Sequence, residues 1–292
     1  MEKNEIIDKI MEKTNYSGLV RSDVEKIYDK FSSKYKDEED IIKEVRNFLR
    51  VNYSGFSGKK LFKWTDKEAD DILKKHLSTR ERFNFYEEVY SRLLKNLPDK
   101  FSIIDLGAGV NGFSYSYLTN VPPTNPLPST QTSLNKKSEI EISSKIKKRG
   151  DKNSERKVNY LGIEAVGQLV DLMNNYFSSN KVKEAEAVHA SLFELDKVKK
   201  LILKMKQPRV VFMLKVVDAL EKVERDYTKS FLKEIILLVD RVVISFATES
   251  WFKRKKFYVN RNWLIDFIKE SGWQFKDDFN LGGERYLIVE KS

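Results

Sequence analysis

From Phe101 to the C-terminus, the chain alternates short apolar runs with stretches whose apolar residues have helical spacing. Strands are expected at 101–106, 158–164, 186–193, 209–215, 241–247, 273–279 and 285–290. Helices are expected between them, near 112–118, 165–179, 196–206, 226–238 and 261–271. Such alternation favours an α/β fold in which helices cover both faces of a mostly parallel sheet. The last two strands meet at Leu281-Gly282-Gly283, a short turn that is typical of an antiparallel hairpin.

The N-terminal part of the chain has helical spacing throughout. Ile6, Ile7 and Ile10 fall on one helical face, and Ser22 begins a Ser-Asp-Val-Glu sequence that predicts the capping box of a second helix. A third helix is expected at 38–51, and a longer helical stretch, 66–97, is expected to be interrupted near Ser78. The sequence is therefore divided into an N-terminal helical domain, 1–97, and an α/β domain, 98–292.

Residues 119–157 do not fit the α/β pattern. They hold four of the six prolines of the chain, together with nine basic and four acidic residues. A segment of this composition cannot bury enough apolar surface to fold alone. We expect a mobile insertion. It either lies along the phosphates of a polyanion such as RNA or is a solvated loop without a partner.

The composition excludes several kinds of chemistry. The 292 residues include no cysteine and only two histidines, so disulfides, thiolate zinc sites and thiol nucleophiles are excluded and no metal site is expected. No apolar run approaches the roughly 20 residues that cross a bilayer. The charged N-terminus has no apolar signal core, so we expect a cytoplasmic protein without a membrane partner. Lys and Arg outnumber Asp and Glu by 54 to 44, and the net charge of +10 favours polyanionic partners such as nucleic acid.

The first predicted strand runs directly into a glycine-rich bend, Asp105-Leu-Gly-Ala-Gly-Val-Asn-Gly112. Gly107 and Gly109 allow the backbone to turn sharply and to approach a ligand where a side chain would clash. Asp105 ends the strand, where a carboxylate can meet the cationic amino group of S-adenosylmethionine (SAM). A pyrophosphate site would use bare amides there, so the bend favours SAM over a nicotinamide dinucleotide.

The second predicted strand also ends in an acid, Glu164, whose carboxylate can accept both hydroxyls of a ribose. The alternative is that Asp105 and Glu164 are ordinary acids at strand ends. After the third strand, Leu192 and nearby backbone amides are candidates for holding an adenine ring. Ser191 stands there where many methyltransferases have an acid that faces the adenine.

The segment His76-Leu-Ser-Thr-Arg-Glu-Arg-Phe83 resembles the His-x-Ser-Thr-x-Glu-Arg-Leu signature of the aminoglycoside-resistance 16S ribosomal RNA guanine-N7 methyltransferases. The likeness extends through 105–109, 211–221 and 243–250, and covers most of residues 70–290 apart from the insertion. It implies the class I SAM-methyltransferase fold, a Rossmann-like sheet of seven strands with a C-terminal antiparallel hairpin. The chain departs from the family at Ala247, where proline is common, and at Glu249, where a basic residue is common.

The resemblance implies that Arg82 binds the methionine carboxylate of SAM, a role that suits a guanidinium fork. Arg80 is an alternative for this contact, and a surface arginine without a role is another. His76 is expected either to bridge helix and cofactor or to be a packed histidine. Ser78 and Glu81 are expected to form a capping box and to have no chemical role.

The residues also bear on which atom is methylated. The usual route to carbon-5 methylation of pyrimidines needs a cysteine, and the fourth strand is not followed by the Asn/Asp-Pro-Pro-aromatic run of amino methyltransferases. Guanine N7 has a free in-plane lone pair, so positioning alone can suffice and no catalytic residue is expected. Ribose 2′-O methylation is the closest rival, because Lys215, Asp218 and Glu221 could form a Lys/Asp/Glu constellation.

An aromatic pair beside a basic cluster follows the fifth strand. Stacking on a flipped base and contact with phosphates would use these residue types. The candidate RNA contacts are Lys215, Trp251, Phe252, Lys253, Arg254, Lys255 and Lys256. The alternative for 251–256 is a lid helix with a solvated face.

We therefore expect a monomeric SAM-dependent methyltransferase that acts on the small ribosomal subunit or its rRNA, in antibiotic resistance or in ribosome maturation. The N-terminal helices would dock on folded rRNA. Three other readings remain open: a SAM methyltransferase of tRNA, protein or a small molecule, a catalytically silent RNA-binding or ribosome-assembly protein, and, more distantly, a nicotinamide oxidoreductase.

Overall fold

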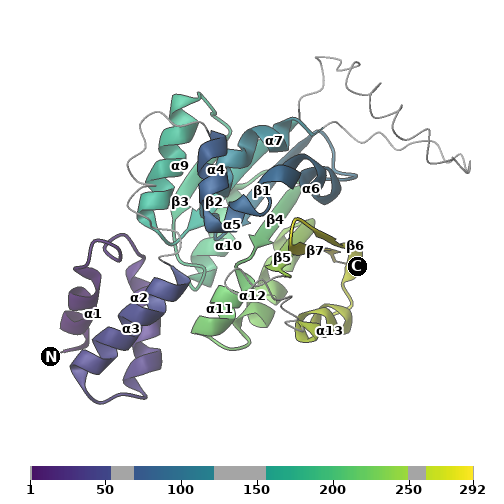
Figure 1. Ribbon diagram of the computed structural model, residues 1–292. Coiled ribbons are helices and arrows are strands. Elements are labelled where there is room, and N and C mark those ends of the chain that lie inside the picture. The colour runs from purple at the N-terminus through teal and green to yellow at the C-terminus, as the bar shows by residue number, and fades with distance from the viewer. Residues whose placement is uncertain (1, 54–68, 122–155, 249–260, 292) are drawn as a thin grey trace, which may run out of the picture.

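The computed structural model describes residues 2–53, 69–121, 156–248 and 261–291. Its centre is a seven-stranded sheet in the order β3-β2-β1-β4-β5-β7-β6, in which β1 to β5 are parallel and the last two strands are antiparallel (Figure 1). The strands are β1 (Lys100–Leu106), β2 (Lys157–Glu164), β3 (Ala185–His189), β4 (Arg209–Leu214), β5 (Arg241–Ala247), β6 (Gln274–Leu281) and β7 (Glu284–Glu290). The predicted seven strands and C-terminal hairpin are confirmed, with Gly282 and Gly283 at positive φ in the turn.

Apolar residues alternate between the two faces of the sheet, because successive side chains of a strand point to opposite sides. Ile103 and Phe212 belong to one apolar cluster, while Ile104 and Met213 belong to the other. Helices α4 (Ala69–Lys75), α6 (Tyr86–Leu93), α7 (Tyr115–Thr119) and α9 (Gly167–Ser179) cover the first face. Helices α10 (Leu195–Lys204), α11 (Val217–Val223), α12 (Tyr227–Ile235) and α13 (Asn262–Glu270) cover the second.

The N-terminal bundle, residues 3–52, consists of α1 (Lys3–Met11), α2 (Arg21–Ser32) and α3 (Glu38–Asn52). Its helices pack through fully buried side chains such as Ile7, Val24 and Val45. Asp37 caps α3 by accepting hydrogen bonds from two backbone amides of the first turn. The capping box predicted at Ser22 is wrong: α2 already begins at Arg21, and the Ser22 hydroxyl donates instead to Glu194, 3.1 Å away.

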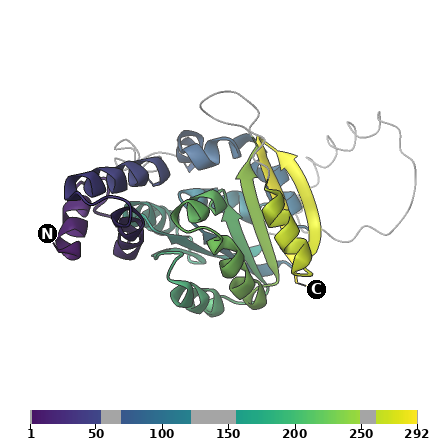
Figure 2. The ribbon, with the colours of Figure 1, turned by 90° about the horizontal axis from the view of Figure 1, so that it is seen from below.

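The bundle is fastened to the loop that follows β2. Leu19 and Val166 form an antiparallel β-bridge, the Val20 amide donates to the Ala165 carbonyl, and the Gly167 amide donates to the Gly18 carbonyl. Lys26 forms an ion pair with Glu224 at the end of α11. Both views place the bundle at the end of the molecule opposite β6 and β7 (Figures 1 and 2). The bundle is therefore attached at the loop that leaves the carboxyl end of β2.

Two details of the α/β part differ from expectation. Strand β3 ends at His189, earlier than the predicted residue 193, because the chain turns at Ser191, whose hydroxyl accepts a hydrogen bond from the Phe193 amide. Helix α11 was not expected, since its residues follow the apolar run of β4 without a turn signal. Of the expected insertion, residues 122–155 lie outside the described residues.

Among the described residues, the other helical segments are α5 (Leu77–Arg80) and the 3-10 turns η2 (Phe83–Phe85), η3 (Asn111–Ser114) and η4 (Ile236–Leu238). Helices α4, α5 and α6 confirm that the long helical stretch is interrupted close to Ser78. Within the described ranges, no helix is both long and apolar enough to span a membrane.

Strand order reverses between β1 and β4, since β2 and β3 lie on one side of β1 and β4 to β7 on the other. In open α/β sheets, ligands bind in the crevice beyond the carboxyl ends of the strands at such a switch point. The carboxyl ends of β1, β2 and β4 are therefore where a functional site is expected.

Phe212 tests the central packing, because it is fully buried on β4 and stacks on Tyr90 of α6. Phe212→Ala is expected to lower the free energy of unfolding by about 3–5 kcal/mol, through lost burial and a residual cavity. Denaturant titration measures this change. Leu237→Ala, at a side chain that is 68% exposed, is the control and should change it by less than about 0.5 kcal/mol. Equal effects of the two variants would contradict the assigned core.

Candidate functional site

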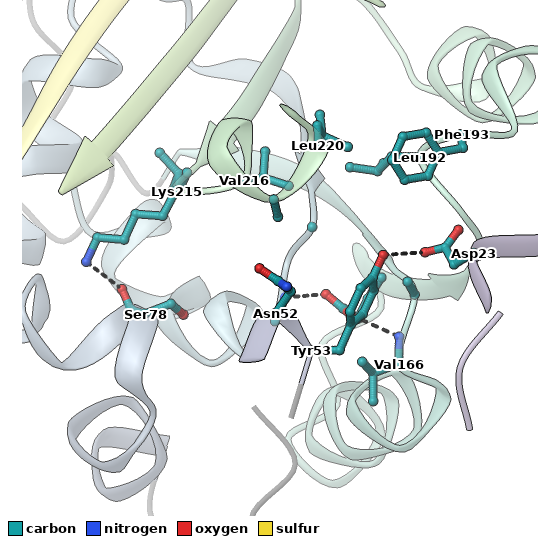
Figure 3. A pocket seen from close by; sticks show the side chains of 16 residues that line it. Asp23, Asn52, Tyr53, Ser78, Val166, Leu192, Phe193, Lys215, Val216 and Leu220 are labelled. Atoms are coloured by element: carbon teal, nitrogen blue, oxygen red, sulfur yellow. Dashed lines mark hydrogen bonds between the residues drawn. The ribbon is translucent and has the colours of Figure 1, made fainter. Parts of the chain in front are cut away.

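A hollow lies at the carboxyl ends of the strands, where the strand order reverses. Its walls come from the ends of β2 and β4, the glycine bend, the loop after β3, α11 and the N-terminal bundle (Figure 3). The lining residues are Asp23, Asn52, Tyr53, Ser78, Gly107, Gly109, Glu164, Ala165, Val166, Leu192, Phe193, Leu214, Lys215, Val216, Ala219 and Leu220. Five predicted site residues are thus brought together at one hollow: Gly107, Gly109, Glu164, Leu192 and Lys215.

The glycine bend has the backbone conformation that the sequence predicts. Gly107 and Gly109 have φ of +71° and +56°, a region that side chains disfavour. A Cβ atom on Gly107 would lie 2.7 Å from Cγ2 of Val216, and one on Gly109 would lie 3.4 Å from Cε1 of His76. Both positions therefore require glycine because of the turn and because neighbouring side chains lie against it.

Glu164 joins the bend to the start of α9. Its Oε2 accepts a hydrogen bond from the Gly109 amide at 2.8 Å, and its Oε1 accepts one from the Val166 amide at 2.9 Å. Burial raises the pKa of Glu164 to about 7, although backbone hydrogen bonds oppose the shift. Each carboxylate oxygen has a second lone pair, so both can still accept a hydrogen bond from a ligand.

Asp105 lies at the end of β1, buried behind the hollow, and is not part of its lining. Its Oδ2 accepts hydrogen bonds from Nδ2 of Asn111 at 2.7 Å and from the Tyr160 hydroxyl at 2.9 Å. Burial raises the pKa of Asp105 to about 6, while these two donors and the charge of Arg82 lower it. Asp105 therefore carries negative charge beneath the glycine bend at neutral pH.

Arg82 is fully enclosed and does not line the hollow. Its Nη1 donates to Oδ1 of Asn111 at 3.0 Å, its Nε to the Tyr286 hydroxyl at 3.2 Å and its Nη2 to Oε1 of Glu284 at 2.8 Å. Sequence reasoning missed Asn111, which links Arg82 to Asp105. The available signal was an amide residue inside an otherwise apolar glycine run.

The buried ion-pair network, Arg82, Glu284, Lys215 and Glu81, connects the hairpin to the hollow. Burial alone would raise the pKa of Glu284, but the charges of Arg82 and Lys215 hold it below its ordinary value. Lys215 has φ of +60° directly after β4, and its Nζ pairs with Glu81 and lies 3.5 Å from Glu284. The Lys215 ammonium is therefore held by carboxylates at one end of the hollow.

The signature segment packs against the glycine bend. Nδ1 of His76 lies 2.9 Å from the Ser78 hydroxyl, and burial together with the Lys215 charge lowers the pKa of His76 to about 3. His76 is therefore neutral near pH 7. The capping box predicted for Ser78 and Glu81 is wrong, because α5 begins at Leu77 and Glu81 pairs with Lys215. The alternative carboxylate ligand, Arg80, is exposed.

Apolar side chains form two sides of the hollow. In Figure 3, Val216, Leu220 and Leu192 lie on one side and Val166 and Tyr53 on the other. This arrangement suits a flat ring. Sequence reasoning missed the bundle residues Asp23 and Asn52 and the adjoining Tyr53, since nothing in helical spacing tells which residue of a helix reaches a distant site.

The Lys/Asp/Glu constellation considered for a ribose hydroxyl is not assembled. Asp218 forms an ion pair with Arg261, whose Nε donates to it at 3.1 Å. The Glu221 carboxylate accepts hydrogen bonds from the backbone amides of residues 226 and 228. Each of the two acids thus has partners of its own, whereas Lys215 pairs with Glu81.

Six of the candidate RNA contacts, Trp251, Phe252, Lys253, Arg254, Lys255 and Lys256, lie outside the described residues. In the described part of the chain, no group of three or more His, Asp or Glu side chains is arranged to hold a metal ion.

Sequence comparison gives one informative relative. No model of a known protein family matches the chain. It is 26% identical over 140 residues to a 16S rRNA (guanine(1405)-N(7))-methyltransferase of Proteus mirabilis, a match that covers 39% of this chain and 50% of the relative. The matched segment thus spans half the length of that protein.

Structural comparison covers the whole chain. The structure of the 16S rRNA methyltransferase RmtF in complex with S-adenosyl-L-homocysteine matches 100% of both chains, with a TM-score of 0.69 at 17% identity. An rRNA methylase from Escherichia coli, at 15% identity, also matches over 100% of both chains with a TM-score of 0.67. The predicted fold and the predicted resemblance to 16S rRNA methyltransferases are confirmed.

Removing one member of the buried ion-pair network tests its role in stability. Glu284→Ala leaves the buried Arg82 guanidinium without its carboxylate and is expected to lower the free energy of unfolding by about 3–5 kcal/mol. The matched control, Asp278→Ala, breaks the partly exposed pair with Arg285 on the same hairpin and should cost less than about 1 kcal/mol. Denaturant titration of both variants measures the difference. A small effect at Glu284 would contradict a buried charged pair.

Proposed function

We propose that this chain is a SAM-dependent methyltransferase of the aminoglycoside-resistance family, which transfers a methyl group to guanine N7 in small-subunit (16S) rRNA. The observation that carries the proposal is the convergence of Gly107, Gly109 and Glu164 on one hollow at the switch point of the sheet. The full-length likeness to rRNA methyltransferase structures supports the same assignment.

The side chains around the hollow fit SAM. The Glu164 carboxylate has lone pairs for two ribose hydroxyls, and the apolar sides formed by Leu192, Val166 and Leu220 suit an adenine ring. Asp105 adds negative charge beneath the bend, which favours the cationic amino group. For the methionine carboxylate we propose Arg82, as the resemblance implies. Its guanidinium is enclosed in this structure and uses three of its five N–H donors within the protein, so it would have to turn toward the hollow to bind the carboxylate. His76, neutral and packed on Gly109, would fix the bend.

In the proposed mechanism the protein accelerates methyl transfer by positioning the guanine relative to the cofactor. Bound SAM supplies a methyl group on a positively charged sulfur. Guanine N7 has a free in-plane lone pair and no proton to lose, so the chain has to hold the base in line and to exclude water. The separate partners of Asp218 and Glu221 favour N7 over the 2′-hydroxyl, which would need a nearby group to take its proton.

The proposed partner is the small ribosomal subunit or its rRNA, in the cytoplasm, with the protein acting as a monomer. We propose that 251–256, which follow β5 in the sequence, contact the flipped base and phosphates. Lys215 is proposed as a further RNA contact. The division into a helical domain, 1–97, and an α/β domain, 98–292, is likewise a proposal, with the helices as the RNA-docking part. The N-terminal bundle supports this, since its residues Asp23 and Asn52 line the hollow.

Methyl transfer to rRNA tests the proposed function directly. Purified protein with methyl-labelled SAM and small ribosomal subunits should place label in 16S rRNA, recovered as 7-methylguanosine after digestion. Glu164→Ala is expected to lower transfer by at least about 100-fold, because it removes the acceptor for both ribose hydroxyls. Asp171→Ala, at an exposed acid of α9 away from the hollow, is the matched control and should keep full activity.

Other outcomes of that assay identify the rival functions. If the label were recovered as a 2′-O-methyl nucleoside, the methylated atom would be the ribose 2′-oxygen and not guanine N7. Label that enters tRNA or protein but never rRNA would leave a methyltransferase with another substrate. Binding of SAM without transfer to any of these would favour a silent RNA-binding protein.

The pKa of Glu164, raised to about 7 by burial, predicts a pH dependence of cofactor binding. Ribose hydroxyls donate hydrogen bonds, so they prefer the ionised carboxylate, and affinity should rise with pH through this pKa. For 5′-methylthioadenosine, which lacks the titrating amino-acid group of SAM, calorimetry should give an increase of about 10-fold between pH 6 and pH 8. Glu164→Gln cannot ionise and should bind weakly with little change over this range. The same pH profile in both proteins would remove Glu164 from the ribose site.

A further inference from the structure

Asp23 of α2 lies where the N-terminal bundle borders the hollow. Figure 3 shows its carboxylate at one end of the hollow, with Lys215 and Ser78 at the opposite end. The β-bridge between Leu19 and Val166 holds the start of α2 beside the loop after β2. Asp23 thus lies at the end of the hollow opposite Lys215, and Leu192 and Phe193 are drawn beside it.

The Asp23 side chain is buried, and the charges of Glu194 and His189 act on it with opposite sign. The residue is only 2% exposed. The Ser191 hydroxyl donates to Oδ1, and the Tyr53 hydroxyl donates to Oδ2 at 3.1 Å. No ion pair within the described ranges includes Asp23, and burial raises its pKa despite these two donors. A buried carboxylate without an ion pair is costly, so its presence at the hollow calls for an explanation.

Attachment of the bundle does not explain the carboxylate. Leu19 and Val20 already form a β-bridge and a backbone hydrogen bond with the loop after β2, and Lys26 pairs with Glu224. A neutral side chain would also accept the hydroxyl of Ser191. The remaining lone pairs of the Asp23 carboxylate can only accept hydrogen bonds, so the matching ligand group is an N–H donor at the edge of a ring held between the apolar sides.

We propose that Asp23 recognises the 6-amino group of the cofactor adenine, so that the N-terminal bundle supplies the base-specificity residue of the site. This inference rests on the proposed function, because it takes SAM as the cofactor. With Glu164 at the ribose, the adenine lies between the loop after β3 and α11, and its amino edge faces Asp23. Ser191 and Tyr53 then orient the carboxylate and keep it from turning away.

The test compares two ligands that differ at that edge of the base. S-adenosylhomocysteine carries the 6-amino donor, whereas S-inosylhomocysteine carries a 6-oxo acceptor at that position, which faces the carboxylate unfavourably, and its N–H donor is displaced to N1. Calorimetry on the full chain should give a preference for the adenine compound of at least about 100-fold, since a buried charged acceptor would lose its donor.

Asp23→Asn keeps the shape of the side chain and adds an amide donor that can bind the 6-oxo group. Its preference for adenine is expected to fall below about 10-fold, mainly through tighter binding of the inosine compound. A merely structural role would weaken both ligands equally and leave their ratio unchanged. Asp29→Asn, at an exposed acid of the same helix, is the matched control and should keep the wild-type ratio.

A second variant covers the case in which Asp23→Asn does not fold. Because Ser191 and Asp23 are hydrogen-bonded, Asp23→Ser combined with Ser191→Asp exchanges the hydroxyl and the carboxylate and should keep the adenine preference. The role of Asp23 would be overturned by an unchanged adenine-to-inosine affinity ratio in Asp23→Asn. It would also be overturned if the exchanged variant still bound S-adenosylhomocysteine but no longer preferred it over the inosine compound. Failure of the wild-type protein to bind S-adenosylhomocysteine would instead overturn the proposed cofactor.

Discussion

The amide of Asn111 is the contact on which the geometry of the site depends. Its Oδ1 accepts hydrogen bonds from Arg82, Tyr86 and, at 3.3 Å, Tyr90, while its Nδ2 donates to Asp105. A single side chain therefore joins the signature segment and α6 to the end of β1. Through Arg82 and Glu284 the same connection reaches the C-terminal hairpin, more than 170 residues later in the chain. Since all of these groups are buried, each must find its partner inside the protein.

Sequence reasoning succeeded where local patterns determine the structure. Alternating apolar runs located the strands, and the glycine bend had the positive φ angles that its spacing implies. It was less accurate where tertiary contacts override local preference. Ser22 and Ser78 both begin capping-box sequences, yet the Ser22 hydroxyl bonds to Glu194 and Ser78 lies beside His76. Glu194 is distant in sequence from Ser22, and Glu81, which would complete the second capping box, pairs with the equally distant Lys215.

The walls of the hollow show the same limit. Glu164 and the glycines could be placed from their strand-end positions, because parallel strands bring their carboxyl ends to one edge. Asp23 and Tyr53 could not, since their position follows from how the bundle docks on the loop after β2. Periodicity predicts that α2 is a helix with an apolar face, but it does not tell which polar residue at the margin of that face will be enclosed.

The β-bridge between Leu19 and Val166 links the N-terminal bundle mechanically to the hollow in the α/β part. Val166 precedes α9 and donates its amide to Glu164, so the bundle is bonded to the same short loop that orients the carboxylate in the hollow. Any force that tilts the bundle is transmitted to that loop through two residues. If a large molecule bound to the bundle changes the affinity of the hollow for a small one, the small molecule changes the affinity of the bundle by the same factor, as thermodynamic reciprocity requires.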